Sequence, residues 1–192
     1  AVAELSAGGG TVFGATADAA DSESLRGFIA AAIEALGGLD IYVHNTSGKP
    51  AKSFEAWKNN FDIDIMALVH GVDAATPALI DGGGSVISIG TTASAEHFAS
   101  GSNSYSAFKA AVVNWTLGQA QVLGAKGVRC NVVSPGPIFI EGGDWDRVKQ
   151  AKPEFFEASA KNHPAGELGT AQDVADAVVF LASDRARHIN GV

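Results

Sequence analysis

The sequence predicts an α/β fold, in which a doubly wound parallel sheet is covered by helices on both faces. Short apolar segments alternate with longer segments of helical periodicity along the 192 residues. The short segments are apolar rather than alternately polar, as expected for strands buried on both faces. Hydrophobic residues make up 46% of the chain and charged residues 18%, a composition that indicates a globular domain rather than disorder.

The first strand and helix are predicted near the N-terminus. The strand is Thr11–Thr16. The helix is Ser22–Leu36, because Ser22 can cap it and its apolar side chains recur with a period of 3.6 residues. Gly37 and Gly38 end this helix, since glycine readily takes the left-handed conformation of a helix C-cap.

The next strand–helix pair fills the middle of the chain. The strand is Leu39–His44, and a long helix is predicted over Ser53–Leu79 with Pro77 near its end. Three glycines, residues 82–84, then turn the chain into the strand Ser85–Ile89.

The remaining elements follow the same alternation. A second long helix is predicted over Ser104–Leu123, followed by the strand Val128–Val133, which a Ser-Pro-Gly-Pro sequence ends. We expect an irregular helix over Asp146–Lys161 and a regular one over Ala171–Ala182. Strand and helix in alternation favour parallel strands joined by right-handed crossovers.

Ligands of such sheets bind at the carboxyl ends of the strands. That edge is predicted to carry Asp18 and the loops of residues 45–48, 90–94 and 134–138. The side chains that carry chemistry are therefore expected in these four segments.

Charge and composition exclude several kinds of partner. Lys and Arg number 13 against 21 Asp and Glu, a net charge of −8 that disfavours binding to nucleic acid or to an anionic membrane. No apolar run reaches the ~18 residues of a membrane span. A single cysteine, Cys130, forms no intrachain disulfide and suits a reducing cytoplasm.

No motif for metal or hydrolytic chemistry is present. The 5 histidines are scattered without a His-Glu-x-x-His motif, so no metal site is predicted. A Gly-x-Ser-x-Gly sequence is also absent, which leaves serine-hydrolase chemistry without support.

The pair Tyr105 and Lys109 carries the clearest chemical signal. The two residues are four apart on one predicted helix and therefore share a face. Tyrosine ordinarily ionises near pH ~10, too high for a base at neutral pH. A nearby lysine cation favours the phenolate and makes tyrosine a usable acid and base.

The surrounding sequence strengthens this interpretation. The helix carries Tyr-Ser-Ala-Phe-Lys-Ala-Ala at residues 105–111, and Gly-Val-Arg-Cys-Asn-Val-Val-Ser-Pro-Gly follows at 127–136. Together with the Gly-Thr-Thr of residues 90–92 and the Ile-Asn-Gly of 189–191, these residues resemble the short-chain dehydrogenase/reductase family. The resemblance runs from Thr11 to Gly191 and implies a Rossmann-like fold, with residues 1–192 as a single domain.

The resemblance also implies roles for individual residues. Tyr105 is similar to the catalytic acid/base, and Lys109 to the lysine that tunes it and binds the nicotinamide ribose. Asp18 matches an acidic residue near the adenine, although a solvated loop residue is an equally good interpretation. Asn45 matches a residue beside the cofactor ribose. The loop that passes the nicotinamide is implied at Pro135, Gly136 and Ile138.

Two catalytic positions depart from the family pattern. The catalytic serine is replaced by threonine: alignment from the strand places it at Thr91, spacing from Tyr105 places it at Thr92, and Ser94 is a weaker third candidate. Threonine keeps the hydroxyl but is stiffer. The family's helix asparagine, which supports a water-linked proton relay to the lysine, falls at Asp64. An acid there could position water or pair with Lys109.

The family's first strand–turn–helix has no counterpart in the sequence. No Gly-x-Gly-x-x-Gly occurs, and the glycines at residues 8–10 and 82–84 follow helices, so they are interpreted as turns. We therefore expect the sheet to lack its first β-α-β unit and its last strand, as the interior part of a longer chain would.

These observations lead to a functional hypothesis. The resemblance implies an oxidoreductase that uses NAD or NADP to interconvert a small carbonyl compound and its alcohol. The alternative is a non-catalytic member of the same fold that binds a ligand or a partner. The two long helices resemble those through which the family forms homodimers and homotetramers. Aromatic residues between Phe139 and Phe156 form either a lid over an apolar substrate or an ordinary buried helix face.

Overall fold

The computed structural model describes residues 1–48, 53–97 and 101–192. The described chain folds around a parallel sheet in the order β1 (Ile41–His44), β2 (Ser85–Ile89), β3 (Arg129–Val133). Ile41 lies opposite Ser85, which lies opposite Arg129, so the strands end together at their carboxyl edge. The parallel sheet expected from the sequence is thereby confirmed.

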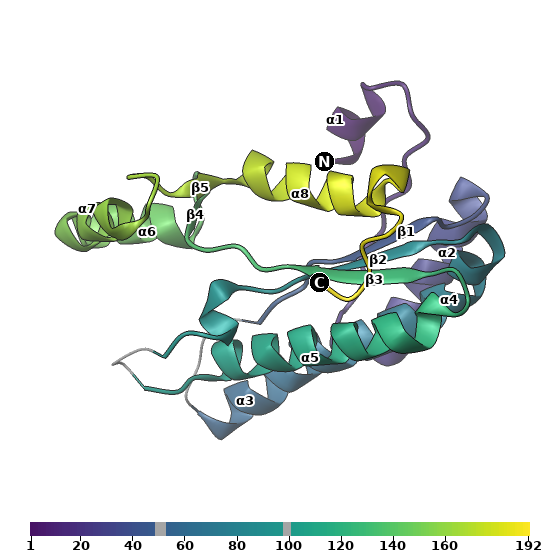
Figure 1. The fold of residues 1–192 in the computed structure, drawn as a ribbon, viewed down its shortest axis with the longest axis horizontal. Helices are drawn as coiled ribbons and strands as arrows, with labels where there is room; N and C mark the ends of the chain where they lie inside the picture. Colours follow the sequence, from purple (N-terminus) through teal and green to yellow (C-terminus); the bar gives the residue numbers. More distant parts are fainter. Residues whose placement is uncertain (49–52, 98–100) are drawn as a thin grey trace.

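Helices cover both faces of this sheet (Figure 1). On one face lie α2 (Ser22–Leu36), α4 (Ala67–Gly82) and α5 (Ser104–Gly124), and on the other lies α8 (Ala171–Ala182). The hydrophobic core forms between the sheet and the first group of helices. Its largest fully buried apolar side chains include Leu68, Leu79, Val86, Val112 and Val128.

The long central helix is continuous but not uniform. It consists of α3 (Phe54–Asn60), the π-helical segment η1 (Phe61–Met66) and α4. Ser53 is its N-cap, with the Ser53 hydroxyl accepting the backbone N–H of Ala56. The helix thus extends to Gly82, three residues beyond the expected end, and contains Pro77 in its interior. The π-helical segment widens the spiral within the first half.

By length and composition, this central helix could cross a membrane. It is 29 residues long from Phe54 to Gly82, and its most apolar window has a mean hydropathy of 1.4. No apolar run of the sequence had indicated this. The helix packs against α2, α5 and β1 and supplies Leu68, Val72 and Leu79 to the core. A core helix of a globular domain meets the same criterion, and the packing explains its apolar character.

One prediction about the C-terminal part required correction, and one short strand pair had not been predicted. The expected helix over Asp146–Lys161 is two helices, α6 (Asp144–Ala151) and α7 (Pro153–Asn162). The break occurs at Lys152 because the following proline disfavours helical geometry in the residue before it and supplies no N–H. A short parallel pair, β4 (Ile138–Phe139) and β5 (Gly169–Thr170), joins this region to α8.

The predicted strand Thr11–Thr16 is wrong. This segment runs between the short helix α1 (Val2–Ser6) and α2 without strand structure. A strand forms only where a neighbour pairs with its backbone, and β1 pairs with β2 alone in the described sheet. Most residues of the segment are exposed, so water can satisfy their backbone groups. Ile41 and Val43 of β1 are correspondingly exposed.

His44 closes β1 as a buried polar residue. Its side chain is 2% exposed, and its Nε2 lies 3.0 Å from the hydroxyl of Thr46. Burial and the nearby Lys109 cation lower the pKa of His44 to about 4. The imidazole is therefore neutral in the folded protein over the whole neutral range.

We predict that His44 makes the fold sensitive to acid. His44 takes up a proton near pH ~6.5 in the unfolded chain but only near pH 4 in the folded chain. The free energy of unfolding therefore falls as the pH drops through this window. The free energy of unfolding in urea should decrease by about 3 kcal/mol more between pH 7 and pH 4 than in His44→Asn. An identical decrease in both proteins would contradict the buried neutral state of His44.

Candidate active site

The loops at the carboxyl edge of the sheet are held together by backbone hydrogen bonds. Gly90 N–H donates to the carbonyl of Val133 (2.8 Å), and Thr92 N–H donates to that of Pro135 (3.0 Å). A Cβ at Gly90 would lie 2.7 Å from the Ser134 hydroxyl oxygen and 3.0 Å from Cγ1 of Val132, so the absence of a side chain at Gly90 eases the close approach of these loops. The segments 90–94 and 134–138 thus form one structure, as the sequence predicted.

Helix α5 brings Tyr105 and Lys109 to this edge. The helix starts at Ser104 because Asn103 caps it, with the Asn103 side-chain oxygen accepting the N–H of Ser106 (2.9 Å). Tyr105 is half-buried on the first turn, and Lys109 is buried one turn later on the same face. The start of α5 contacts the short helix η2 (Thr92–Ser94), which follows β2.

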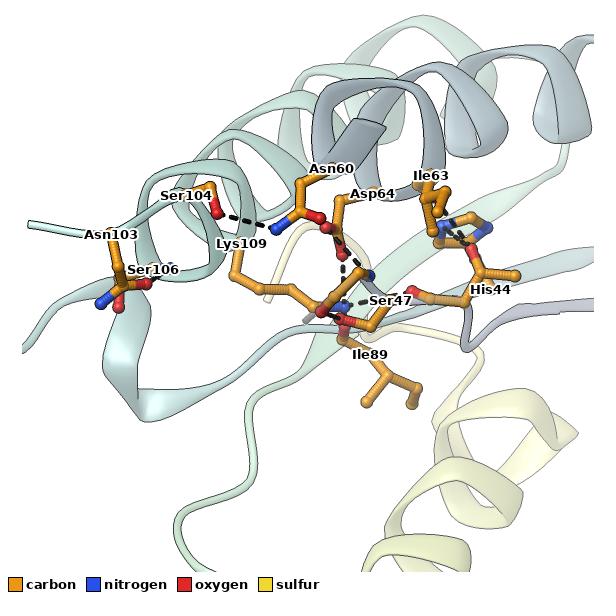
Figure 2. A network of polar contacts seen from close by, with 12 residues as sticks. His44, Ser47, Asn60, Ile63, Asp64, Ile89, Asn103, Ser104, Ser106 and Lys109 are labelled. Atoms are coloured by element: carbon orange, nitrogen blue, oxygen red, sulfur yellow. Dashed lines mark hydrogen bonds and ion pairs between the residues drawn. The ribbon is translucent and has the colours of Figure 1, made fainter. Parts of the chain in front are cut away.

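The ammonium group of Lys109 is the centre of a polar network (Figure 2). Its Nζ donates to the carbonyl of Ile89 at the end of β2 (2.8 Å) and to that of Thr46 after β1 (3.4 Å). The carboxylate oxygen Oδ1 of Asp64 lies 3.7 Å away. Burial lowers the pKa of Lys109, and the Asp64 carboxylate counteracts this effect.

Asp64 faces this lysine from the π-helical segment. Its side chain is fully buried, and its Oδ2 accepts the backbone N–H of Gly48 (3.2 Å). Burial raises the pKa of Asp64, while the Lys109 cation opposes the rise. Its Oδ1 has no hydrogen-bond partner among the residues that the structure describes. The pairing with Lys109 that the sequence left open is therefore present.

Two further hydrogen bonds belong to this network, and the sequence analysis had not singled out Asn60. Asn60, one turn before Asp64, donates from Nδ2 to the hydroxyl of Ser104 (2.7 Å) and so connects α3 with α5. Thr46 donates its hydroxyl to the carbonyl of Ile63 (3.2 Å). The signal for Asn60 was its spacing, since Asn60 and Asp64 are four residues apart and share one face of the helix, and both are buried.

The two candidate threonines lie next to each other at the end of β2. Thr91 is buried, and its hydroxyl oxygen accepts the N–H of Ala93 (3.3 Å) as the cap of η2. Thr92 is half-buried and bonds the loop at Pro135 through its backbone. Ser94, the weaker candidate, ends η2. Each of these hydroxyls remains able to donate a hydrogen bond.

The residues expected near the cofactor divide into two groups. Pro135, Gly136 and Ile138 are half-buried in the loop after β3, close to Thr92. Asp18 and Asn45 are exposed. Asp18 accepts the N–H of Ala20 (2.9 Å) and precedes α2, and it takes no part in the Lys109 network.

Aromatic side chains from α6, α7 and β4 form a cluster. The helices α6 and α7 extend beyond the sheet (Figure 1). The rings of Trp145 and Phe155 stack with centroids 6.2 Å apart, and Phe156 meets Trp145 and Phe139 edge-on. The Lys149 ammonium lies over the rings of Phe139 and Phe156. Phe155 nevertheless remains 57% exposed, so this cluster presents an apolar surface. No group of His, Cys, Asp and Glu in residues 1–48, 53–97 and 101–192 could hold a metal ion.

Comparison with known proteins identifies the family. The model of the family described as Enoyl-(Acyl carrier protein) reductase matches residues 1–192. The 2,5-dichloro-2,5-cyclohexadiene-1,4-diol dehydrogenase LinX of Sphingobium indicum is 35% identical over 198 residues, which span 100% of this chain and 76% of the relative.

Solved structures of dehydrogenases share the fold. A short-chain dehydrogenase from Burkholderia cenocepacia in complex with NADP has a TM-score of 0.89 and 29% identity, over 99% of this chain and 77% of its own. A 7α-hydroxysteroid dehydrogenase complexed with NADH and 7-oxo glycochenodeoxycholic acid has a TM-score of 0.88 and 28% identity, over 99% and 74%. The chain therefore belongs to the short-chain dehydrogenase/reductase family and is an NAD(P)-dependent dehydrogenase.

Proposed function

We propose that this dehydrogenase interconverts a secondary alcohol and the corresponding ketone, with Tyr105 as the acid/base. The observation that carries the proposal is the buried ammonium of Lys109, which is fixed by the carbonyls of Ile89 and Thr46 one helical turn after Tyr105. A fixed cation favours the phenolate form of a neighbouring tyrosine and so lets it exchange a proton near neutral pH.

The residues present fit the nicotinamide half of the cofactor. At Gly136 the nearest atom to an added Cβ would be the Thr92 methyl group at 4.0 Å, so the loop backbone is accessible from this side. The exposed amide of Asn45 offers a donor to the hydroxyls of a ribose. Pro135, Gly136 and Ile138 would hold the nicotinamide, which when bound supplies or accepts the hydride.

The chain's own residues handle the proton and the oxygen. In alcohol oxidation, the Tyr105 phenolate accepts the proton of the substrate hydroxyl, and in ketone reduction the Tyr105 phenol returns it. The hydroxyl of Thr91 or Thr92 donates a hydrogen bond to the same substrate oxygen and orients it.

The substrate is proposed to carry its hydroxyl on an apolar ring. The aromatic surface of α6 and α7 follows the loop at Ile138, and an apolar ring would bury against Trp145 and Phe155. Two of the compared proteins are named for such substrates, a cyclohexadiene diol and a hydroxysteroid. The nonpolar contact supports binding, and Tyr105 selects the carbon that reacts.

We predict that Tyr105→Phe lowers kcat by about 10²–10⁴-fold, because the substrate oxygen loses its proton donor and acceptor. Binding of NADH and NADPH, followed by nicotinamide fluorescence, should remain unchanged. The matched control is Tyr42→Phe, which removes the hydroxyl of the only other tyrosine and should retain activity. Turnover by Tyr105→Phe at the unmodified rate would refute the assignment.

A paired substitution distinguishes the two threonines. Thr91→Val and Thr92→Val each remove one hydroxyl at nearly constant volume. The variant that removes the oxygen-binding hydroxyl should lose about 10²-fold or more in kcat. Serine at the same position should restore activity, whereas a purely structural loss at the cap of η2 would appear as reduced thermal stability. Full activity in both valine variants would show that neither threonine hydroxyl binds the substrate oxygen.

A further inference from the structure

A cavity of about 840 Å³ lies at the amino edge of the sheet, opposite the edge that carries the candidate active site. It is lined by the turns that precede the three strands, at Asp40, Gly84 and Val128. Ser85 N–H donates to the carbonyl of Asp40 (2.9 Å) and Arg129 N–H to that of Gly84 (3.0 Å), so hydrogen bonds join these turns. A volume in this range is typical of cavities that hold small ligands. None of the residues that line it takes part in the proposed reaction.

The hydroxyl of Ser85 is a buried group that lacks a partner at this cavity. The side chain is 1% exposed, and its Oγ forms no hydrogen bond with any residue that the structure describes. Val86 belongs to the core between the sheet and the helices α2, α4 and α5. The alternation of side chains along β2 therefore turns Ser85 toward the opposite face, where the end of α8 lines the cavity. A buried hydroxyl without a partner lowers stability, so a ligand that bonds to it gains free energy.

Arg129 fixes one wall of the cavity. Its half-buried guanidinium donates to the carbonyls of Leu181 (2.6 Å), Ala182 (3.2 Å), Ser183 (3.3 Å) and Ile189 (3.4 Å). These bonds hold the end of α8, and the segment that follows it, against the start of β3. The wall is therefore in place before a ligand binds, and the charge of Arg129 is engaged by carbonyls of the protein itself.

Charged side chains of both signs lie at the cavity without partners. Asp40 lies next to β1, whereas Arg187 belongs to the segment after α8, which runs beside β3 and donates from Gly191 N–H to the carbonyl of Cys130 (3.0 Å). Neither the Asp40 nor the Arg187 side chain forms a hydrogen bond or an ion pair with another described residue. The strand order β1-β2-β3 places Ser85 between them. The cavity thus presents a carboxylate, a hydroxyl and a guanidinium in this order.

We propose that this cavity binds an ω-amino acid, a small zwitterion whose ammonium group pairs with Asp40 and whose carboxylate pairs with Arg187. A simple anion would meet the carboxylates of Asp40 and Asp184, and a simple cation would meet Arg187, so a molecule with both charges fits better than either. The outer strands are two strand spacings apart, about 10 Å, which suits charges separated by several methylene groups. Ser85 and His188 offer further donors to the ligand's carboxylate.

Nuclear magnetic resonance of the purified protein tests the proposal with 5-aminopentanoate as the probe. The backbone amide signals of Gly83, Gly84 and Ser85 should shift and saturate as the probe is added. The dissociation constant should lie in the millimolar range, because solvent-accessible ion pairs give a modest affinity. Pentanoate and pentylammonium each keep one charge on a chain of the same length, and each should bind at least about tenfold more weakly. Equal affinity for either single-charge compound would contradict the zwitterion.

Substitutions at the two ends of the cavity test the pairing. Arg187→Ala and Asp40→Asn each remove one charge and should raise the dissociation constant at least about tenfold, and Ser85→Ala should raise it about threefold. The matched control is Arg185→Ala, which removes the same charge two residues away, where the guanidinium lies over the ring of Phe180 and outside the cavity. It should bind the probe within about twofold of the unmodified protein. Equal weakening by Arg185→Ala and Arg187→Ala would overturn the proposal.

A measurement on the unmodified protein covers the case in which a variant does not fold. Nuclear Overhauser contacts should connect the methylene protons of bound 5-aminopentanoate with the amide protons of Gly83 and Gly84. The absence of these contacts at saturation, or the absence of saturation, would overturn the proposal. Because these signals depend on neither cofactor nor turnover, the presence or loss of dehydrogenase activity bears only on the proposed function.

Discussion

The candidate active site depends on one constraint, which is that the buried ammonium of Lys109 must be neutralised and hydrogen-bonded. A buried cation is tolerated only when its donors find acceptors and a counter-charge. Here the acceptors are the carbonyl ends of two adjacent strands, at Ile89 and Thr46, and the counter-charge comes from Asp64. The register of β1 on β2 therefore fixes the position of the lysine, and Tyr105 lies one turn earlier on the same helix, α5.

The π-helical segment connects this site with the core. The same continuous helix must bury Leu68 and Leu79 against the sheet and direct Asn60 and Asp64 toward α5. A helix with strict 3.6-residue periodicity keeps one face along its length, whereas a π-helical segment rotates the residues before it relative to those after it. This change of face explains how one helix serves both the apolar core and the polar network.

The sequence predicted best those elements that local interactions determine, and it predicted worst those that depend on contacts between distant parts of the chain. The helix Ser22–Leu36 and the strand Ser85–Ile89 were predicted with their observed bounds, because caps, glycines and apolar periodicity act locally. Thr11–Thr16 has a strand-like composition but lacks a pairing neighbour, which composition cannot reveal. The contact between Asp64 and Lys109 joins two helices that are far apart in the sequence, so local patterns could not predict it and only the family resemblance suggested it. The choice between Thr91 and Thr92 depends on loop length and remains a prediction.

The buried ion pair makes position 64 important for stability. Removing one partner from a buried ion pair leaves an uncompensated charge, which costs about 3–5 kcal/mol, so the carboxylate of Asp64 supports the folded state as long as Lys109 is present. An asparagine at this position, as in the family pattern, would leave the ammonium to the strand carbonyls of Ile89 and Thr46 alone. With aspartate, the buried ammonium also has a counter-charge, so the ion pair ties the π-helical segment to α5 at the point where β1 and β2 end.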